Sequence, residues 1–421
     1  MIQRRRPAGM GVTLFAASVL AGPTLADPLG DAVLRGLARH PEVRLAEAEV
    51  SQAGIEAAMA RNGYLPALSA SSGPAPAGLG YDLSLTQTLT DWGQTGGQVD
   101  QRKAMLAQQQ ANLDVVRDDA ALEIVETWMD LASARARLSV IDEQLARLED
   151  LSGMARTRVE GRYSDASETG RVALAVATAQ GQRAVAAGEL AEAQDRFELL
   201  VGQAPGVIGL PMLPTFLDRV REEGALEAAI ASAPLFRKAA LGVDVAEGGV
   251  REARAARFPR LNLEGSLQRR EIGGRMVDDS AIALRLRMET QRGLTALQRP
   301  QLAAQRREAA LWEAEVVGRE LQRVVEALIR SDAALGQRIA ALQDQAEQAD
   351  AVRLLYREQF LVGRRDIQDL VIMETEQFEA ERQLIELTIE RLRLQYRAAA
   401  QLGLLTRFMA GDEMQMPAGT P

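Results

Sequence analysis

The sequence predicts a mainly α-helical protein with a small β part, in which duplicated long coiled-coil hairpins are combined with four β-strands. Three observations predict this class. The chain repeats itself once, residues 97–160 and 295–361 form two very long helical runs, and short segments before them alternate apolar and polar residues. Four strands are too few to close around a lumen, because small barrels need about eight. Several copies of the chain are therefore expected to share one transmembrane barrel.

Composition removes most catalytic chemistries. The 421 residues are 47% hydrophobic and 25% charged, which is typical of a folded chain. With no cysteine and a single histidine, the chain has no thiolate nucleophile, no disulfide and no usual zinc ligand set. His40 precedes Pro41 at a helix start and is expected at the surface. No phosphate-binding loop is present, and the net charge of -9 disfavours nucleic acid as a partner. We expect no enzyme, no cofactor and no metal site.

The first 26 residues have the pattern of a secretory signal peptide. Arg4, Arg5 and Arg6 precede an uncharged, largely apolar stretch, and Ala26 ends a small-residue cleavage site. The apolar core is shorter than the roughly twenty residues of a spanning helix, which argues against an anchor. A mature chain starting near Asp27 changes its charge from 49 − 58 = -9 to 46 − 58 = -12. The protein is expected to be exported.

The duplication is visible in paired prolines. Pro41 and Pro234 each begin a helical run, and Pro66 and Pro259 each follow its end. The spacings are 234 − 41 = 193 and 259 − 66 = 193. Each half is predicted to contain a helix, two strands, a very long helix, a turn and a medium helix.

The boundaries follow from the same comparison. Gly161 matches Gly363 at 363 − 161 = 202, so the offset grows along the chain. The first repeat is assigned to residues 27–210 and the second to residues 211–406, which meet in a segment rich in glycine and proline. Residues 407–421 are predicted to be a disordered tail.

The strands have a period of two residues. Apolar side chains on one face alternate with polar ones on the other, as in a barrel with lipid outside and water inside. The alternative is a water-soluble antiparallel sheet with one solvated face. The apolar residues are Leu83, Leu85, Leu89, Leu261, Leu263, Leu267, Ile282, Leu284, Leu286 and Met288, and the aromatic residues expected at the bilayer interface are Tyr64, Trp92 and Phe258. The charged residues expected to face the lumen are Glu264, Arg285, Arg287 and Glu289.

The two long runs are predicted to be single helices. They contain no proline except Pro300 near the second start, and at 1.5 Å per residue each is about 95 to 100 Å long. A leucine seam in the first run predicts packing against a neighbouring helix, of another copy or of the same hairpin. Its members are Leu131, Leu138, Leu145 and Leu148.

Each long helix ends in a glycine turn remote from the strands. The turns span residues 159–165 and 360–366, and glycine is expected to supply the positive φ that they need. If the strands lie in a membrane, these turns form a tip deep in the periplasm, where a gate or docking surface is expected. The alternative is an ordinary solvated turn.

The residues together resemble the TolC outer membrane efflux family. The resemblance rests on the order of segments, the duplication, the strand end at residues 89–93 and the turn at residues 356–370. It implies a homotrimer whose twelve-stranded barrel, four strands per chain, continues into a helical tunnel across the periplasm. Within the family, residues 356–370 and the residues after them most resemble the type I secretion branch, which works with an ABC transporter and a membrane fusion protein. The later residues are Glu376, Phe378, Ala380 and Arg382.

The resemblance also implies a gate held by polar links at the tip. Counted from Gly363, Arg365 matches the basic position and Asp369 an acidic one, whereas a second acidic position falls on Ile372. In the first half the corresponding acidic position falls on Ser167. The candidate tip residues are Gly161, Ser164, Asp165, Gly363, Arg364, Arg365, Asp366 and Asp369.

The expected function is an outer membrane channel-tunnel component of a tripartite export system. Such a component passively conducts protein or small molecules from an inner-membrane pump, either an ABC transporter or another efflux pump. Its further contacts are a membrane fusion protein and outer membrane lipid. The alternative is a soluble periplasmic coiled-coil scaffold or adaptor.

Overall fold

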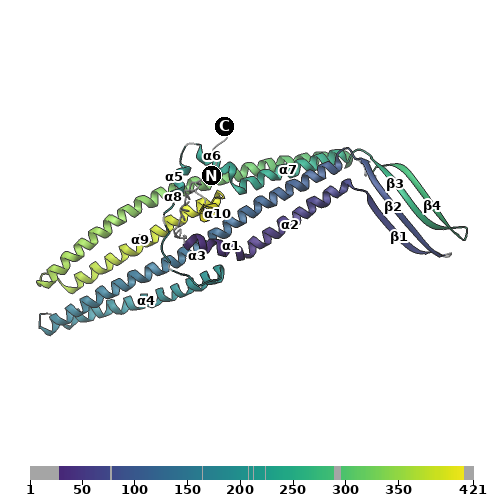
Figure 1. Cartoon of the computed structure of the whole chain (residues 1–421). Coiled ribbons are helices and arrows are strands. Elements are labelled where there is room, and N and C mark those ends of the chain that lie inside the picture. The colour runs from purple at the N-terminus through teal and green to yellow at the C-terminus, as the bar shows by residue number, and fades with distance from the viewer. Residues whose placement is uncertain are drawn as a thin grey trace, which may run out of the picture.

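The computed structural model shows an elongated chain, in which two long helical hairpins lie beside each other and a four-stranded sheet extends from one end (Figure 1). Short helices gather near the middle of the hairpins. The described residues are 28–75, 78–163, 165–206, 208–211, 213–222, 224–288 and 295–411. Among their helices, none combines the length and the hydropathy that crossing a bilayer requires.

The first half of the chain builds one hairpin and two strands. Its elements are α1 (Pro28–Arg39), α2 (Pro41–Arg61), the 3-10 turn η1 (Asn62–Tyr64), β1 (Ala67–Ala75), β2 (Gly78–Thr90), α3 (Gln94–Glu160) and α4 (Ala166–Val201).

The second half repeats this order after two short helices. Its elements are α5 (Phe216–Val220), α6 (Ala225–Ser232), α7 (Pro234–Ala255), β3 (Arg260–Ile272), β4 (Arg275–Arg287), α8 (Thr295–Leu361), α9 (Ile367–Gln401) and α10 (Leu405–Met409). The predicted fold class, long helical hairpins with four strands, is confirmed.

The offset between the halves grows in two equal steps. Helices α2 and α7 start 234 − 41 = 193 residues apart, and so do β1 and β3 at 260 − 67 = 193. Strands β2 and β4 have 13 residues each and start 275 − 78 = 197 apart. Helices α3 and α8 have 67 residues each and start 295 − 94 = 201 apart. The offset of 201 therefore relates the two long helices residue by residue.

Proline begins both helices that lead into the strands. Its fixed φ suits the first helical turn, where its missing N–H costs no hydrogen bond. His40 is the N-cap residue before Pro41, and only 5% of its surface is exposed. Its Nε2 lies 3.2 Å from a carboxylate oxygen of Glu123 on α3. The prediction of a surface histidine was wrong, because the start of α2 packs against α3.

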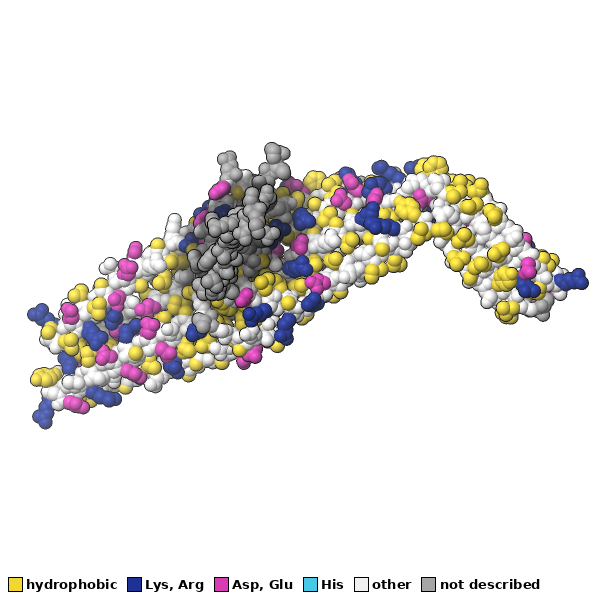
Figure 2. Space-filling model, viewed as in Figure 1, with side chains coloured by type: hydrophobic (Ala, Val, Ile, Leu, Met, Phe, Trp, Pro, Cys, Tyr) yellow, Lys and Arg dark blue, Asp and Glu magenta, His cyan; other side chains and the backbone are white. Residues whose placement is uncertain are grey.

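The sheet is antiparallel throughout, in the order β1-β2-β3-β4. Its register pairs Leu83 with Leu267 and Leu263 with Leu284, so apolar side chains from neighbouring strands share one face. That face is not covered by the rest of the chain: Ile282 is 84% exposed and Leu286 is 70% exposed. Figure 2 shows hydrophobic side chains spread over the sheet on the visible side. The predicted alternation of an apolar and a polar face is therefore present.

Aromatic side chains gather where the strands meet the helices. The rings of Trp92 and Phe258 lie 5.4 Å apart, and the Trp92 indole N–H donates to the Pro259 carbonyl at 2.9 Å. Tyr64 ends the turn before β1 and is 55% exposed. These residues lie at strand ends, as the sequence indicates.

The main core lies at the middle of the molecule. It joins α1, α3, α4, α8, α9 and the short helices, and its largest fully buried side chains include Phe216, Ile124 and Leu131. Leu148 of the predicted seam is 2% exposed and packs in a second core near the hairpin tips, where Leu145 adjoins it. The leucine seam of α3 thus packs within the chain.

Two predictions concern the ends of the chain. The predicted signal peptide at residues 1–26 lies outside the described residues. The predicted disordered tail begins at Arg407, but α10 includes Arg407 and ends at Met409, which is only 6% exposed. This boundary is corrected: the short helix packs on the main core, and residues 412–421 lie outside the described part.

Candidate functional site

The two hairpin tips close with the same backbone motif. At each tip one residue in the left-handed conformation follows the long helix, and the next N–H donates back five residues, as in a Schellman motif. In the second tip Gly363 has φ 75° and the Arg364 N–H donates to the Gln359 carbonyl at 2.8 Å. In the first tip Arg162 has φ 61° and the Tyr163 N–H donates to the Arg158 carbonyl at 2.9 Å.

This geometry corrects the register of the first tip. Gly161 has φ −75°, which any residue can adopt, so the prediction that it supplies the positive φ was wrong. The structural counterpart of Gly363 is Arg162, at 363 − 162 = 201. In this register the acidic counterpart of Asp369 is Glu168 rather than Ser167. The two tips therefore both carry a carboxylate in the first turn of the returning helix.

Aspartates begin both returning helices. The Asp165 carboxylate accepts the Ser167 backbone N–H at 2.7 Å, and Asp366 accepts the Gln368 N–H at 3.3 Å. Each is an N-cap that satisfies a helix N–H left without an intrahelical partner. Hydrogen bonds from the Ser167 side chain and backbone hold the pKa of Asp165 below its usual value. Both candidate residues therefore have a structural role as helix caps.

Arg365 is the best-anchored candidate at the second tip. Its guanidinium donates to Gln359 at 3.1 Å and to Asp369 at 3.3 Å, and it lies 4.0 Å from the ring centre of Tyr356. Asp369, in the first turn of α9, is thus paired with Arg365 of the preceding turn, four residues away. Arg364, in contrast, is exposed. The candidate Ser164 lies outside the described residues.

Behind the tips, apolar side chains of both hairpins pack together in the second core, and polar contacts join the turns themselves. The Arg158 guanidinium lies 4.5 Å from the ring centre of Phe360 and donates to the Arg365 carbonyl at 3.4 Å. Arg171 of α4 donates to the Gln368 amide of α9. Arg171 is also the counterpart of Ile372, which is 43% exposed, in the register of 201. A basic and an apolar residue therefore occupy these corresponding positions.

Several apolar side chains are exposed at the tip beside its charged residues. A groove of about 670 Å³ runs between the two turns. Tyr163 is 81% exposed and Val362 is 70% exposed beside it. The groove is lined by Met154, Thr157, Arg158, Tyr163, Phe360, Leu361, Val362 and Gly363.

A buried charged network behind the tip was missed from the sequence. Glu374 of α9 is buried, and its carboxylate lies 2.9 Å from Arg147 of α3 and 3.2 Å from Arg353 of α8. Arg147 also contacts Glu381 at 3.2 Å. Because one carboxylate bridges three helices, this network ties the first hairpin to the second. A signal was available: Glu374 continues the seam of Ile367 and Leu370 at steps of three and four.

A second buried carboxylate lies near the middle of the molecule. Asp118 of α3 is 4% exposed and accepts hydrogen bonds from the Thr406 N–H at 2.7 Å and hydroxyl at 2.8 Å. Burial raises the pKa of Asp118 to about 6, and the charges of Asp114 and Asp119 act in the same direction. The two hydrogen bonds from Thr406 oppose the shift. Asp118 thereby links α3 to the segment that begins α10.

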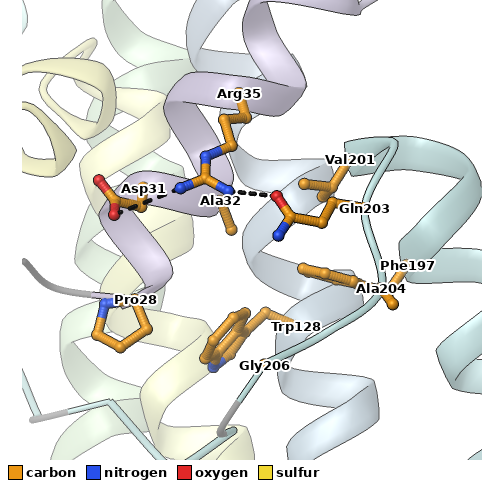
Figure 3. A pocket seen from close by; sticks show the side chains of 10 residues that line it. All are labelled: Pro28, Asp31, Ala32, Arg35, Trp128, Phe197, Val201, Gln203, Ala204 and Gly206. Atoms are coloured by element: carbon orange, nitrogen blue, oxygen red, sulfur yellow. Dashed lines mark hydrogen bonds and ion pairs between the residues drawn. The ribbon is translucent and has the colours of Figure 1, made fainter.

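A small cavity of about 230 Å³ lies between α1, α3 and α4 (Figure 3). Arg35 points across it toward Asp31 on its own helix, at 3.8 Å, and toward Gln203 beyond the end of α4. Trp128 and Phe197 form its apolar wall, with ring centres 5.7 Å apart. These contacts fix the end of α4 against α1. Among the described residues no cluster of His, Cys, Asp and Glu could hold a metal ion.

The candidate lumen charges lie together at the helix end of the sheet. Glu264 of β3 lies 2.9 Å from the Arg285 guanidinium and 3.1 Å from that of Arg287, both on β4. The structure therefore brings three of the four predicted charges into one cluster. The fourth, Glu289, lies outside the described residues.

Solved structures of outer membrane channels share this fold. The chain matches CusC, described in connection with transmembrane channel formation, with a TM-score of 0.79 at 14% identity over 90% of this chain and 92% of that one. It matches the outer membrane protein VceC of Vibrio cholerae with a TM-score of 0.75 at 16% identity over 89% and 96%. It matches the open MtrE outer membrane channel of Neisseria gonorrhoeae with a TM-score of 0.72 at 19% identity over 90% and 89%.

No protein-family model matches the sequence, and no curated protein matches it either. At identities of 14 to 19%, the structural matches establish the fold alone. They extend over nearly all of this chain and of each matched chain, so the hairpins and the sheet are shared together.

Proposed function

We propose that this protein is the outer membrane channel-tunnel component of a tripartite export system. The observation that carries the proposal is the sheet at one end of the long helical hairpins. One face of this sheet is apolar and is not covered by the rest of the chain, and the opposite face is polar. A contiguous exposed apolar surface needs lipid or protein to cover it. A bilayer would cover it while the hairpins extend into the periplasm.

The proposed assembly is a homotrimer. Strands β1 and β4 are the two edges of the sheet within the chain, and their unpaired backbone groups cannot be left in lipid. Pairing β4 of one copy with β1 of the next closes the sheet. Three copies supply twelve strands, above the minimum of about eight for a barrel with a lumen. Strands β2, β3 and β4 have 13 residues each, which is enough to cross a bilayer when the strands are tilted.

The proposed partners are a periplasmic membrane fusion protein and an inner-membrane pump. The resemblance of residues 356–370 to the type I secretion branch favours an ABC transporter and a protein substrate. Small-molecule efflux by another pump is the second possibility, and the described outer membrane channels CmeC of Campylobacter jejuni and OprN share the fold at 13% and 18% identity. In either case the channel conducts passively, and the pump selects the substrate.

The alternative is a soluble periplasmic scaffold or adaptor. The extent of the match to outer membrane channels, over both the sheet and the hairpins, supports the channel. A soluble scaffold would also have to cover Ile282, Leu284 and Leu286, which are 84%, 66% and 70% exposed.

The deciding experiment combines mass and conductance. The mature protein is purified in detergent, its mass is measured by light scattering, and single-channel currents are recorded in a planar bilayer. We expect a trimer that inserts and conducts. A monomer or dimer that stays in solution without detergent would refute the channel and favour the scaffold.

A further inference from the structure

The arginine cluster on the sheet is asymmetric in charge. Its single carboxylate, Glu264, is 14% exposed and lies beneath two guanidiniums. The side chains of Arg285 and Arg287 are 62% and 65% exposed. Each guanidinium has five N–H donors, whereas the one carboxylate that they share offers only about four acceptor sites. The cluster therefore presents two positive groups to solvent over one negative group that is largely covered.

Strand register places this cluster on the polar face of the sheet. Glu264 lies opposite Thr86 on β2 and Ala283 on β4, and Arg285 lies opposite Asn262. Successive residues of a strand point to opposite faces, so these side chains lie across the sheet from the apolar ones. In the proposed barrel the cluster faces the lumen.

Among the charges that the structure describes on this face, the cluster carries the surplus. At the far end, Arg270 and Arg275 are balanced by Asp82 and Asp279, and Arg270 lies 3.8 Å from Asp279. At the helix end Arg260 also lies on this face, opposite Arg287, and binds Gln94 at 2.9 Å.

Asp91, at the end of β2, offsets the charge of Arg260 through a favourable coulombic interaction. One net positive charge per chain remains on the cluster of Glu264, Arg285 and Arg287. The proposed trimer would repeat that charge three times around one level of the lumen.

On these observations we propose that the Glu264–Arg285–Arg287 cluster makes the barrel lumen prefer anionic solutes. The inference rests on the proposed function, since it requires a lumen. A ring of like charge in a narrow aqueous passage raises the local concentration of counter-ions. Guanidinium groups also match carboxylate and phosphate oxygens in geometry, so acidic solutes are the class expected to benefit. The whole chain has a net charge of -9, so this preference would be local to the barrel.

The test is a reversal potential across a planar bilayer with a gradient of potassium chloride. The wild-type pore should pass chloride more readily than potassium. The double substitution Arg285→Gln with Arg287→Gln should lower the chloride-to-potassium permeability ratio at least about twofold, because it removes two positive charges per copy. The double substitution Arg285→Lys with Arg287→Lys keeps the charge and should keep the ratio.

A matched control lies on the same strand pair. Arg269 of β3 pairs with Asp278 at 3.4 Å on the opposite face of the sheet, and Arg269→Gln should leave the ratio unchanged. Trimer migration on unheated gels checks that each variant assembles.

The outcomes separate the two proposals. A protein that forms no pore refutes the proposed function, and this inference with it. A wild-type pore that prefers potassium, or a ratio unmoved by the glutamine pair, overturns the anion preference alone. A ratio that falls equally in the lysine pair would also overturn it, because a loss at constant charge has a structural cause.

Discussion

The two halves of the chain have the same backbone but bury different side chains. Helices α3 and α8 match residue by residue at an offset of 201, and both tips close with one motif. At 332 − 201 = 131, however, the second half buries Asp332 where the first half buries Leu131. At 374 − 201 = 173, it buries Glu374 where the first half has Ala173.

The difference shows how one duplicated fold acquired two kinds of interior. The second hairpin places carboxylates in its seam and binds them with arginine: Asp332 contacts the Arg391 guanidinium at 2.9 Å and the Gln395 amide at 3.0 Å. The first hairpin has only apolar or small residues at these two corresponding positions. A buried charge is costly without a partner, so each carboxylate fixes the position of the helices that supply its partners.

Ion pairs also join the two hairpins along their length. Arg393 and Arg397 of α9 reach Asp130 at 2.5 Å and Glu126 at 2.7 Å on α3. Each of these pairs has at least one side chain that is exposed by more than a third, and such pairs contribute only about 0 to 1 kcal/mol each. The buried network at Glu374 should therefore dominate the polar coupling between the hairpins.

The largest effect is expected from Glu374→Ala. Removing this carboxylate takes away the buried partner of both Arg147 and Arg353. It should destabilise the protein by about 3 kcal/mol, the lower end for a broken buried pair, because Glu381 and Asp350 still contact these arginines. Thermal unfolding in detergent measures the loss. The control is Glu379→Ala on the same helix, whose half-exposed pair with Arg382 should contribute about 0.5 kcal/mol. Equal effects of the two substitutions would contradict the proposed importance of the network.

The next effect is a pH dependence specific to the first half. The pKa of Asp118 is about 6, above its ordinary value of 3.8, so its ionisation opposes folding above pH 6. The free-energy cost of keeping Asp118 ionised in the folded protein disappears as the pH falls from about 6 to about 4. Acidification over this range should therefore increase the free energy of unfolding by as much as roughly 3 kcal/mol. Asp118→Asn should remove that gain.

The check is thermal unfolding at several pH values between 4 and 7. The counterpart of Asp118 in the second half is Arg319, which is exposed, and Arg319→Gln should leave the pH profile as it is. Parallel profiles for wild type and Asp118→Asn would show that Asp118 does not titrate in this range.

A smaller effect distinguishes the two tip glycines. Gly363→Ala places a Cβ on a residue with φ 75° and should cost about 1 to 2 kcal/mol. Gly161→Ala should cost less, because its φ is −75° and a new Cβ would lie 2.8 Å from the exposed Tyr163 ring, which can move, and 3.3 Å from the Thr157 carbonyl oxygen. Arg162→Gly should stabilise the first tip by about 1 kcal/mol.

Hydrogen exchange of the peptides that span each tip reports these changes locally. Faster exchange at the second tip in Gly363→Ala, with no change at the first tip in Gly161→Ala, is the expected result. Faster exchange at the first tip in Gly161→Ala, with no change at the second tip in Gly363→Ala, would contradict this register. It would favour the correspondence of Gly161 with Gly363 that the sequence indicates.

The smallest change in stability is expected from Arg365→Ala combined with Asp369→Ala. Their pair is about one-third exposed and joins the turn to the start of α9, so its loss should cost about 0.5 kcal/mol. If this tip is the gate of the proposed channel, the variant should nevertheless conduct more in a planar bilayer than wild type. An unchanged conductance would make the turn a simple connection between helices.

The sequence by itself determined the elements and their order. Helical and strand periods, paired prolines and alternating faces are local properties, so they identified two long helices, four strands and the duplication. The charges of Glu264, Arg285 and Arg287 on the polar face of the sheet were identifiable for the same reason, because strand alternation assigns a face without any tertiary information.

Only the tertiary structure decided which distant residues meet. The register of the first tip depended on which backbone position takes the left-handed conformation, and that position is Arg162 rather than the nearby Gly161. The burial of His40 and the bridge from Glu374 to Arg147 join residues on separate helices. Such contacts depend on how whole helices lie against one another, and helix placement is set by the packing of many side chains together rather than by any local pattern.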